Sequence, residues 1–209
     1  MRSPSDNSGA QLKPQQKPAP KSASQSKTTA STGTGIAAKI LQGEKRNLSF
    51  GGYNWRVLDV PGDKALMITE DIIEKRPYNT KYVYVTWVTC TLRQYLNGEF
   101  FHKFSSECRA QILSVNLANP DNPSYGTKGG NNSKDNIFLL SIDEVKKHFK
   151  NDERVANHAG TARWWWLRSP GIAGHAAGVL PDGDVNDHGR RIDYVSGGVR
   201  PALWLNLKS

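Results

Sequence analysis

The chain has 209 residues, which suits one domain with a tail or two small domains, and it carries a net charge of +9 at pH 7. Apolar residues make up 37% of it, and no run of them approaches the ~20 residues that cross a bilayer, so we expect no membrane span. The first 36 residues hold five basic side chains and one acid, a charge of +4, and leave +5 for the remainder, which is too mild to indicate a nucleic-acid partner.

Residues 1–36 are predicted to form a disordered basic tail or linker. Pro, Ser, Thr, Lys and Gln dominate this stretch, and it has no aromatic residue with which to offset the entropy of ordering. It also shows no hydrophobic signal region. Every Trp, Tyr and Phe follows residue 36, so residues 37–209 are expected to form one folded domain.

The folded part is expected to open with a β-hairpin. Residues 53–60 alternate aromatic and aliphatic side chains, which predicts a strand. Residues 61–64, Pro-Gly-Asp-Lys, predict a turn, and residues 65–69 predict the second strand. Residues 82–88 are rich in β-branched and aromatic side chains and predict either a short strand or an extended loop.

Three helices are expected in the middle of the chain. Apolar side chains recur at helical spacing in residues 91–100. A second helix is expected to start at Ser105 or Ser106 and to run through residue 113. A third helix is predicted over residues 141–149, because Ser141 and Glu144 form the sequence signature of a capping box. The apolar stripes of these helices are typical of a scaffold that faces the core.

A long loop rich in turn formers is predicted over residues 119–136. Six of its side chains supply oxygen atoms of the kind that calcium takes: Asp121, Asn122, Asn131, Asn132, Asp135 and Asn136. Their spacing does not match an EF-hand, and only Asp121 and Asp135 carry charge. We therefore expect turns that bond to themselves, with calcium at these two carboxylates as the alternative, and no other metal or cofactor.

Three adjacent tryptophans begin the C-terminal segment. On a strand, Trp164 and Trp166 would share one face and Trp165 would point to the other, so at least one face must be core. Sugar stacking by these rings is the alternative. Short strands are also expected at Val179 and Val185, around a Pro-Asp-Gly turn, and a last strand near the C-terminus. Structural roles are expected for Trp165, Trp166, Arg168, Arg200 and Trp204, with the arginines in buried hydrogen bonds or stacked on tryptophan.

The residues that could carry catalysis form no known motif. The chain has no GxSxG, HExxH, phosphate-binding GxxxxGK or dinucleotide-binding GxGxxG sequence, so we expect a non-enzymatic protein. Cys90 and Cys108 lack metal-site spacing and are expected to be buried thiols, with a disulfide as the alternative. A metal-dependent hydrolase is a further alternative, since His175 and His188 flank three aspartates, Asp182, Asp184 and Asp187.

Six segments resemble an uncharacterised family of bacterial domains. They are FGGYNWRVLDV (50–60), ITEDIIEKRPYN (68–79), TLRQYLNGEF (91–100), NPDNPSYGTKGGNNSKDNIFLLSIDEV (119–145), WWLRSPG (165–171) and GGVRPALWL (197–205). Members of that family look like distant relatives of the formylglycine-generating-enzyme branch of the C-type lectin fold. The resemblance implies an α+β domain in which N- and C-terminal strands pair and two or three helices flank a small sheet. It does not carry over the enzyme activity, because Cys90 and Cys108 lie too early in the domain.

The C-terminal segment is also similar to variable proteins of diversity-generating retroelements, a second group on this fold. In such proteins the ligand-binding residues are altered at template adenines, often in asparagine codons. Randomising both adenines of AAC cannot encode Lys, Glu, Gln, Met or Trp, and residues 171–199 contain none of the five. Average usage would give about five in such a stretch. The alternative is a turn-rich segment that merely avoids long charged side chains.

We therefore expect a binding protein whose variable-type surface lies near the C-terminus and recognises a protein or a glycan. The predicted ligand-binding residues are Ile172, His175, Leu180, Asp184, Asn186, Asp187, His188, Arg190, Arg191, Asp193, Tyr194 and Ser196. The resemblance favours display on a cell surface or a virion. The alternative function is a structural or assembly domain of a bacterial surface or phage-like particle, and homo-oligomerisation stays open in both cases.

Overall fold

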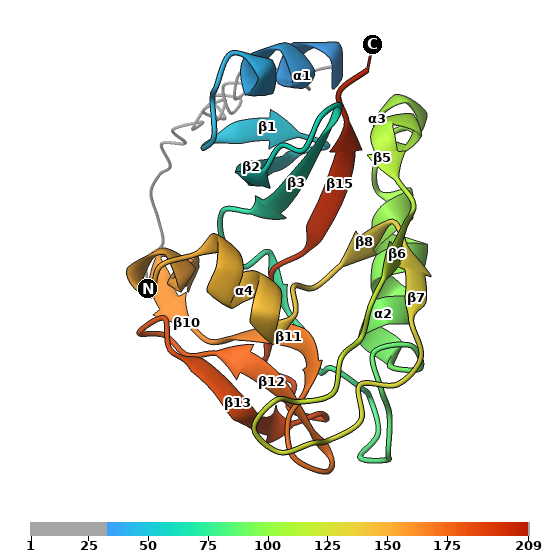
Figure 1. The fold of residues 1–209 in the computed structure, drawn as a ribbon, viewed down its shortest axis with the longest axis vertical. Coiled ribbons are helices and arrows are strands. Elements are labelled where there is room, and N and C mark those ends of the chain that lie inside the picture. Colours follow the sequence, from blue (N-terminus) through green and yellow to red (C-terminus); the bar gives the residue numbers. More distant parts are fainter. Residues whose placement is uncertain (1–32, 209) are drawn as a thin grey trace, which may run out of the picture.

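The computed structural model describes residues 33–208, which form the predicted α+β fold with helices packed beside two main sheets (Figure 1). The first element is the helix α1 (Gly33–Leu41). It spans the domain boundary expected at residue 37, because Ile36 and Ile40, four residues apart, are both buried on one face. The predicted tail up to residue 32 lies outside the described residues. Among residues 33–208, no helix is long and apolar enough to pass through a bilayer.

The first sheet brings together strands from the beginning and the end of the domain. Its members are β1 (Leu48–Phe50), β2 (Tyr53–Asp59), β3 (Lys64–Thr69), β5 (Ile112–Leu113), β8 (Ile137–Phe138) and β15 (Ala202–Asn206). β2 and β3 form the predicted hairpin. β15 runs antiparallel to β3, with Leu203 opposite Met67, so an early and a late strand are paired as expected.

The second sheet lies at the other end of the molecule and holds the C-terminal segment (Figure 1). Its members, in spatial order, are β13 (Val185–Arg191), β12 (His175–Val179), β11 (Trp165–Pro170), β14 (Gly198–Val199) and β4 (Glu74–Lys75). β12 and β13 form the hairpin that the Pro-Asp-Gly turn predicts, with Val179 opposite Val185. The chain leaves this sheet after Val199 and enters the first sheet at Ala202, so a few residues join the two.

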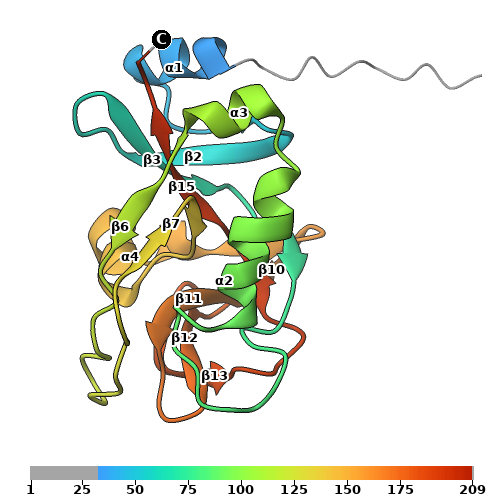
Figure 2. The ribbon, with the colours of Figure 1, turned by 90° about the vertical axis from the view of Figure 1, so that its right-hand side faces the viewer.

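The helices follow one side of both sheets or cover their junction (Figure 2). They are α2 (Thr91–Tyr95), the π-helical turn η1 (Leu96–Phe100), α3 (Ser106–Gln111), α4 (Ile142–His148) and the 3₁₀ turn η2 (Asp152–Arg154). α2 and η1 together confirm the helix predicted over residues 91–100. The Cys90 thiol caps it by accepting a hydrogen bond from the Arg93 amide. The capping box of α4 is present, with Ser141 and Glu144 each bonded to the other's backbone.

Two expectations fail where short strands pair. The helix predicted to end at residue 113 stops at Gln111, because Ile112 and Leu113 pair with β15. The loop predicted over residues 119–136 closes at residue 132, because β7 (Ser133–Asp135) pairs with β6 (Val115–Leu117). A second small hairpin joins β9 (Ala156–His158) to β10 (Thr161–Arg163). Backbone pairing with another strand sets both the end of the helix at Gln111 and the end of the loop at residue 132. Local sequence spacing does not predict such pairing.

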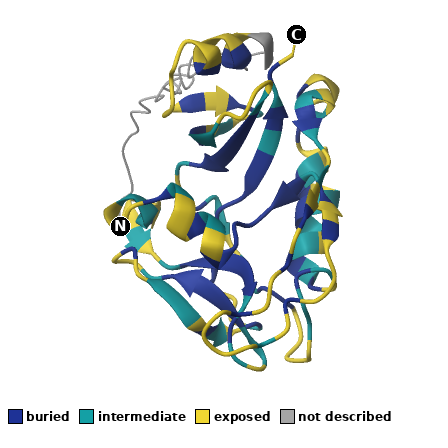
Figure 3. Ribbon diagram, in the orientation of Figure 1, coloured by how far each residue is buried: buried dark blue, intermediate teal, exposed yellow. Residues whose placement is uncertain are grey.

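The buried core runs through both sheets (Figure 3). Trp165 and Trp166 are fully buried, and the Trp164 ring lies 4.6 Å from the Trp166 ring, so these two share a face as predicted. Cys90 and Cys108 are buried free thiols. Burial raises the pKa of Cys90 to about 12, so this thiol stays protonated and unreactive at neutral pH.

Both arginines assigned structural roles are buried, while the tryptophan of the last strand is partly exposed. Arg200 donates to the carbonyl oxygens of Thr69 and Glu70 and lies 5.0 Å from the centroid of the Trp165 ring. Trp204 is half-buried, and the amino group of Lys64 lies 4.7 Å from its ring. The Arg200 contacts hold the end of the first sheet against the second, whereas Lys64 and Trp204 lie on β3 and β15, which are paired within the first sheet.

Arg168 forms a second buried hub, between β11 and α4. Its guanidinium pairs with the Glu144 carboxylate and donates to the carbonyl oxygens of Leu139, at 3.0 Å, and Ala118, at 3.1 Å. Burial raises the pKa of Glu144, but the hydrogen bond and charge of Arg168, with the Ser141 amide, outweigh burial and lower it overall.

We expect Glu144→Gln to lower the free energy of unfolding by about 3 kcal/mol at pH 7, because Arg168 keeps its buried charge and loses its counter-ion. The pKa of Glu144 is depressed in the folded state, so its contribution is present above the unfolded value of about 4.3 and is lost as pH falls through the folded value. Urea unfolding from pH 7 to pH 3 should show the difference between the two proteins shrinking in acid. Glu99→Gln, at an exposed glutamate, is the control. A constant difference over this pH range would contradict the assignment.

Candidate binding surface

The large exposed apolar side chains of residues 33–208 gather mainly on three loops. These loops lie at the end of the molecule that carries the β12–β13 hairpin (Figures 1 and 2). Of eight such residues, six lie there, on three loops: Tyr82, Val83, Tyr84, Tyr125, Tyr194 and Val195. We call these six residues, together with Ala173, Gly174, His175, His188, Arg191 and Asp193, the loop surface. Exposed apolar groups concentrated in this way mark interaction sites.

Arg191 links two of the tyrosines. Its guanidinium carbon lies 4.4 Å from the centroid of the Tyr82 ring and 6.0 Å from that of Tyr194. Its other contact is the Asp193 carboxylate, at 2.9 Å, and this hydrogen bond lowers the pKa of Asp193. The arginine and both rings therefore hold one another in place before any ligand arrives.

A shallow apolar hollow of about 250 Å³ lies beside this group, between residues 82–84 and Ala173 and Gly174. Gly174 has φ of +75°, and a Cβ there would come within 2.6 Å of the Tyr82 hydroxyl. The positive φ favours glycine at this point, where the two loops approach closely. Residues 82–88 form the extended loop that was one of the two predicted alternatives.

Two histidines and a tyrosine continue the surface. The rings of His175 and His188 are 5.6 Å apart, and the Tyr125 ring lies 5.7 Å from His188 in an edge-on arrangement. His175 lies on β12 and His188 within an irregular part of β13, while Tyr125 belongs to the loop between β6 and β7. The β12–β13 hairpin and the β6–β7 loop, which are far apart in the sequence, therefore contribute to one face.

Asn122 fastens the β6–β7 loop to the second sheet. Its side-chain nitrogen donates to the carbonyl oxygens of Pro170, at 2.7 Å, and Asp187, at 2.8 Å. Its side-chain oxygen accepts from the amides of Ser124 and Tyr125. The side chain is buried with all four bonds made, so it fixes Tyr125 relative to the hairpin.

The structure divides the predicted ligand-binding residues into three groups. The loop surface or its immediate edge contains Ile172, His175, Asp187, His188, Arg191, Asp193, Tyr194 and Ser196. Leu180 and Asp184 lie in the turn at the opposite end of the hairpin, where Asn151 donates to Asp184. Asn186 and Arg190 are partly buried. The Asn186 oxygen accepts from the Gly189 amide, and Arg190 lies 5.0 Å from the Trp164 ring.

The sequence did not identify residues 82–84 and Tyr125 as part of the loop surface. It indicated Asn122 only as a possible oxygen ligand for calcium. The run Tyr-Val-Tyr-Val in residues 82–85 is the one available signal, because so many large apolar side chains in a loop call for a partner. Their meeting with Gly174 is a long-range contact with no periodic pattern.

The carboxylates considered for calcium are already paired with cations. Asp121 accepts from Lys128 at 2.7 Å. Asp135 is buried and accepts from Arg93 at 2.7 Å and from the Trp87 ring nitrogen at 2.8 Å. In the part of the chain that the structure describes, no three His, Cys, Asp or Glu side chains converge as a metal site.

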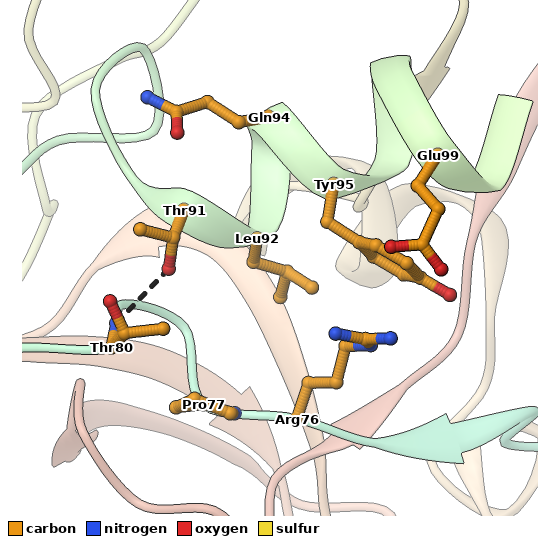
Figure 4. Close-up of a pocket in the computed structure, with 8 residues that line it drawn as sticks. All are labelled: Arg76, Pro77, Thr80, Thr91, Leu92, Gln94, Tyr95 and Glu99. Carbon is orange, nitrogen blue, oxygen red and sulfur yellow. Dashed lines mark hydrogen bonds between the residues drawn. The ribbon is translucent and has the colours of Figure 1, made fainter.

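A separate hollow lies between α2 and the segment that follows β4 (Figure 4). Arg76 and Tyr95 face one another there, with the guanidinium carbon 3.5 Å from the ring centroid. Glu74 accepts from both, at 2.9 Å and 2.6 Å. The polar groups at this end of the hollow thus bind each other, and the arrangement stabilises the contact between α2 and β4.

Fold and surface together define an α+β domain that presents tyrosines on loops beside the histidines and the arginine of a β-hairpin. The chain belongs to the DUF6273 family, described as a domain of unknown function, whose family model matches residues 62–207. No curated protein and no solved structure matches the chain.

We expect Asn122→Ala to lower the free energy of unfolding by about 2 kcal/mol, because two carbonyl oxygens and two amides lose their partner. Hydrogen exchange of residues 120–130 should accelerate more than exchange in β2 and β3. Asn132→Ala, at an exposed asparagine of the same loop, is the control. Equal stability of both variants would show that Asn122 does not anchor the loop.

Proposed function

We propose that the chain is a non-enzymatic binding protein whose loop surface recognises a protein or a glycan. The gathering of exposed tyrosines on loops anchored to the second sheet carries this proposal. Such loops can present contact residues without weakening the core that holds them. Tyr and Arg are also the residue types that contribute most to binding energy at interfaces.

The geometry of the surface supports a preorganised contact. Arg191 lies between Tyr82 and Tyr194, so the three side chains lose little conformational freedom when a ligand binds. The hollow beside them is lined by aliphatic and aromatic groups, including Val83 and Ala173. An apolar side chain of a protein partner fits this lining better than a hydroxyl-rich sugar ring, which favours the protein alternative.

We also propose that exposed positions between residues 172 and 196 are diversified, on a C-type-lectin-like scaffold displayed on a cell surface or a virion. The absence of five residue types from residues 171–199 supports this. Packing narrows the set of positions that could vary. A Cβ at Gly178 would come within 2.8 Å of the Trp165 carbonyl oxygen, so that position must stay glycine.

Arg191→Ala combined with Tyr194→Ala should weaken binding at least ~10-fold while leaving the melting temperature nearly unchanged, because both side chains are exposed. The measurement is binding to a defined glycan array and to a panel of purified surface proteins. Arg163→Ala, an exposed arginine on β10, is the control. A large loss of stability in the double variant would show that these residues serve the fold.

Self-assembly is the competing function, since the same apolar surface could pack against a second copy. Sedimentation over a range of concentrations separates the two. A stable oligomer of the wild-type protein that the double variant at Arg191 and Tyr194 abolishes would favour the assembly role. A monomer at all concentrations would favour an external ligand.

The DNA flanking the gene tests diversification directly. We expect a nearby second copy of codons ~165–205 that differs from the gene only at its adenines, beside a reverse-transcriptase gene, with the differences at outward-facing codons. Two results would refute a diversified surface: the absence of any copy, or a copy whose altered codons fall on buried positions. In either case the binding proposal would rest on the loop surface alone.

A further inference from the structure

We propose that His175 and His188 together bind a divalent transition-metal ion of the Zn²⁺ type, with solvent in the remaining coordination positions. The rings are 5.6 Å apart with an angle of 70° between their planes. Zinc binds imidazole nitrogen at about 2.0–2.1 Å, so a tetrahedral ion holds two ring centroids about 5 Å apart. The observed separation is close to this value.

The His175 ring has the hydrogen bond that orients a metal-binding imidazole, and the His188 ring has a longer polar contact of the same kind. Nδ1 of His175 lies 3.0 Å from the carbonyl oxygen of Ala173, and Nδ1 of His188 lies 3.5 Å from that of Gly189. A carbonyl oxygen can only accept, so these contacts favour the tautomer in which Nδ1 donates and Nε2 of the neutral ring keeps its lone pair. Metal-binding histidines are held in this way, by donation from the second nitrogen to a carbonyl or a carboxylate.

The backbone that carries the two rings is fixed on both sides. The carbonyl oxygen of His188 accepts from the Ile172 amide at 3.0 Å, and the amide and carbonyl of His175 bond to Ile172 and Gly171 at 2.9 Å each. Gly171 packs so closely against both histidines that any side chain there would clash with them. The pair is therefore preorganised on rigid elements, as a designed site requires.

Two protein ligands make an open site. His188 is exposed and His175 half-buried, so water or a group from a bound partner can complete the coordination. Imidazole suits zinc, copper and nickel, whereas calcium and magnesium prefer oxygen, so the pair selects the first group. The inference needs no ligand on the loop surface, and its failure would leave the proposed binding function untouched.

The test uses the full chain without an affinity tag and Zn²⁺ as the probe. Long-range ¹H–¹⁵N NMR should show the side chains of His175 and His188 shifting with one equivalent of Zn²⁺ while the other three histidines stay in place. Competition with a chromophoric chelator should show that His175→Ala and His188→Ala each weaken binding at least ~10-fold.

His102→Ala is a matched control and should bind Zn²⁺ as the wild type does. His102 is exposed, and its Nδ1 also lies within 2.7 Å of a backbone carbonyl, that of Gly98, but its nearest described aromatic neighbour is Phe101. Equal shifts of all five histidines, or equal weakening by His102→Ala and His188→Ala, would overturn the proposal. So would an absence of binding by the wild-type protein.

Discussion

Arg200 stands where the chain passes from the second sheet to the first, and both sheets depend on how its charge is satisfied. Burial, with the charge of nearby Arg56, lowers its pKa to about 9, so the fully buried guanidinium is still a cation at neutral pH. No carboxylate contacts it among the described residues, and carbonyl oxygens from the end of β3 and the ring of Trp165 surround it instead. A buried cation left without these partners would be very costly. The observed placement of the two sheets meets this requirement.

That placement sets the position of the loop surface. β14 fixes β11, β11 fixes the β12–β13 hairpin, and Asn122 ties the β6–β7 loop to the same hairpin. Gly174 then lets Tyr82 approach from a loop that precedes α2. The steps up to Asn122 use backbone bonds or buried side chains, so the exposed groups at the end of the series can change without disturbing them. A surface built in this order suits recognition, because stability and contact chemistry rest on different residues.

Local patterns were enough to predict the β2–β3 hairpin, the Ser141–Glu144 capping box and the β12–β13 turn, since each is encoded within a few residues. The same reasoning could place Trp165, Trp166 and Arg168 in the core. Adjacent tryptophans on a strand must bury at least one face, and an arginine beside them must find hydrogen-bond acceptors or an aromatic ring. It could not find the meeting of Tyr82 with Arg191 or of His175 with His188. Those contacts depend on loop docking and on irregular strand register, which leave no spacing in the sequence.

Arg190 and Arg191 show how the fold limits what sequence composition can say about this segment. They are adjacent and chemically identical, yet Arg190 packs over Trp164 and Arg191 reaches Tyr82 on the loop surface. The alternation of side chains along β13 decides this difference. Both arginines can be encoded by a randomised asparagine codon. Only Arg191, which points outward, can be replaced without loss of packing against Trp164. The geometry of the strand therefore limits which residues can be substituted. A diversified version of this domain would have to alternate variable and fixed positions along the hairpin.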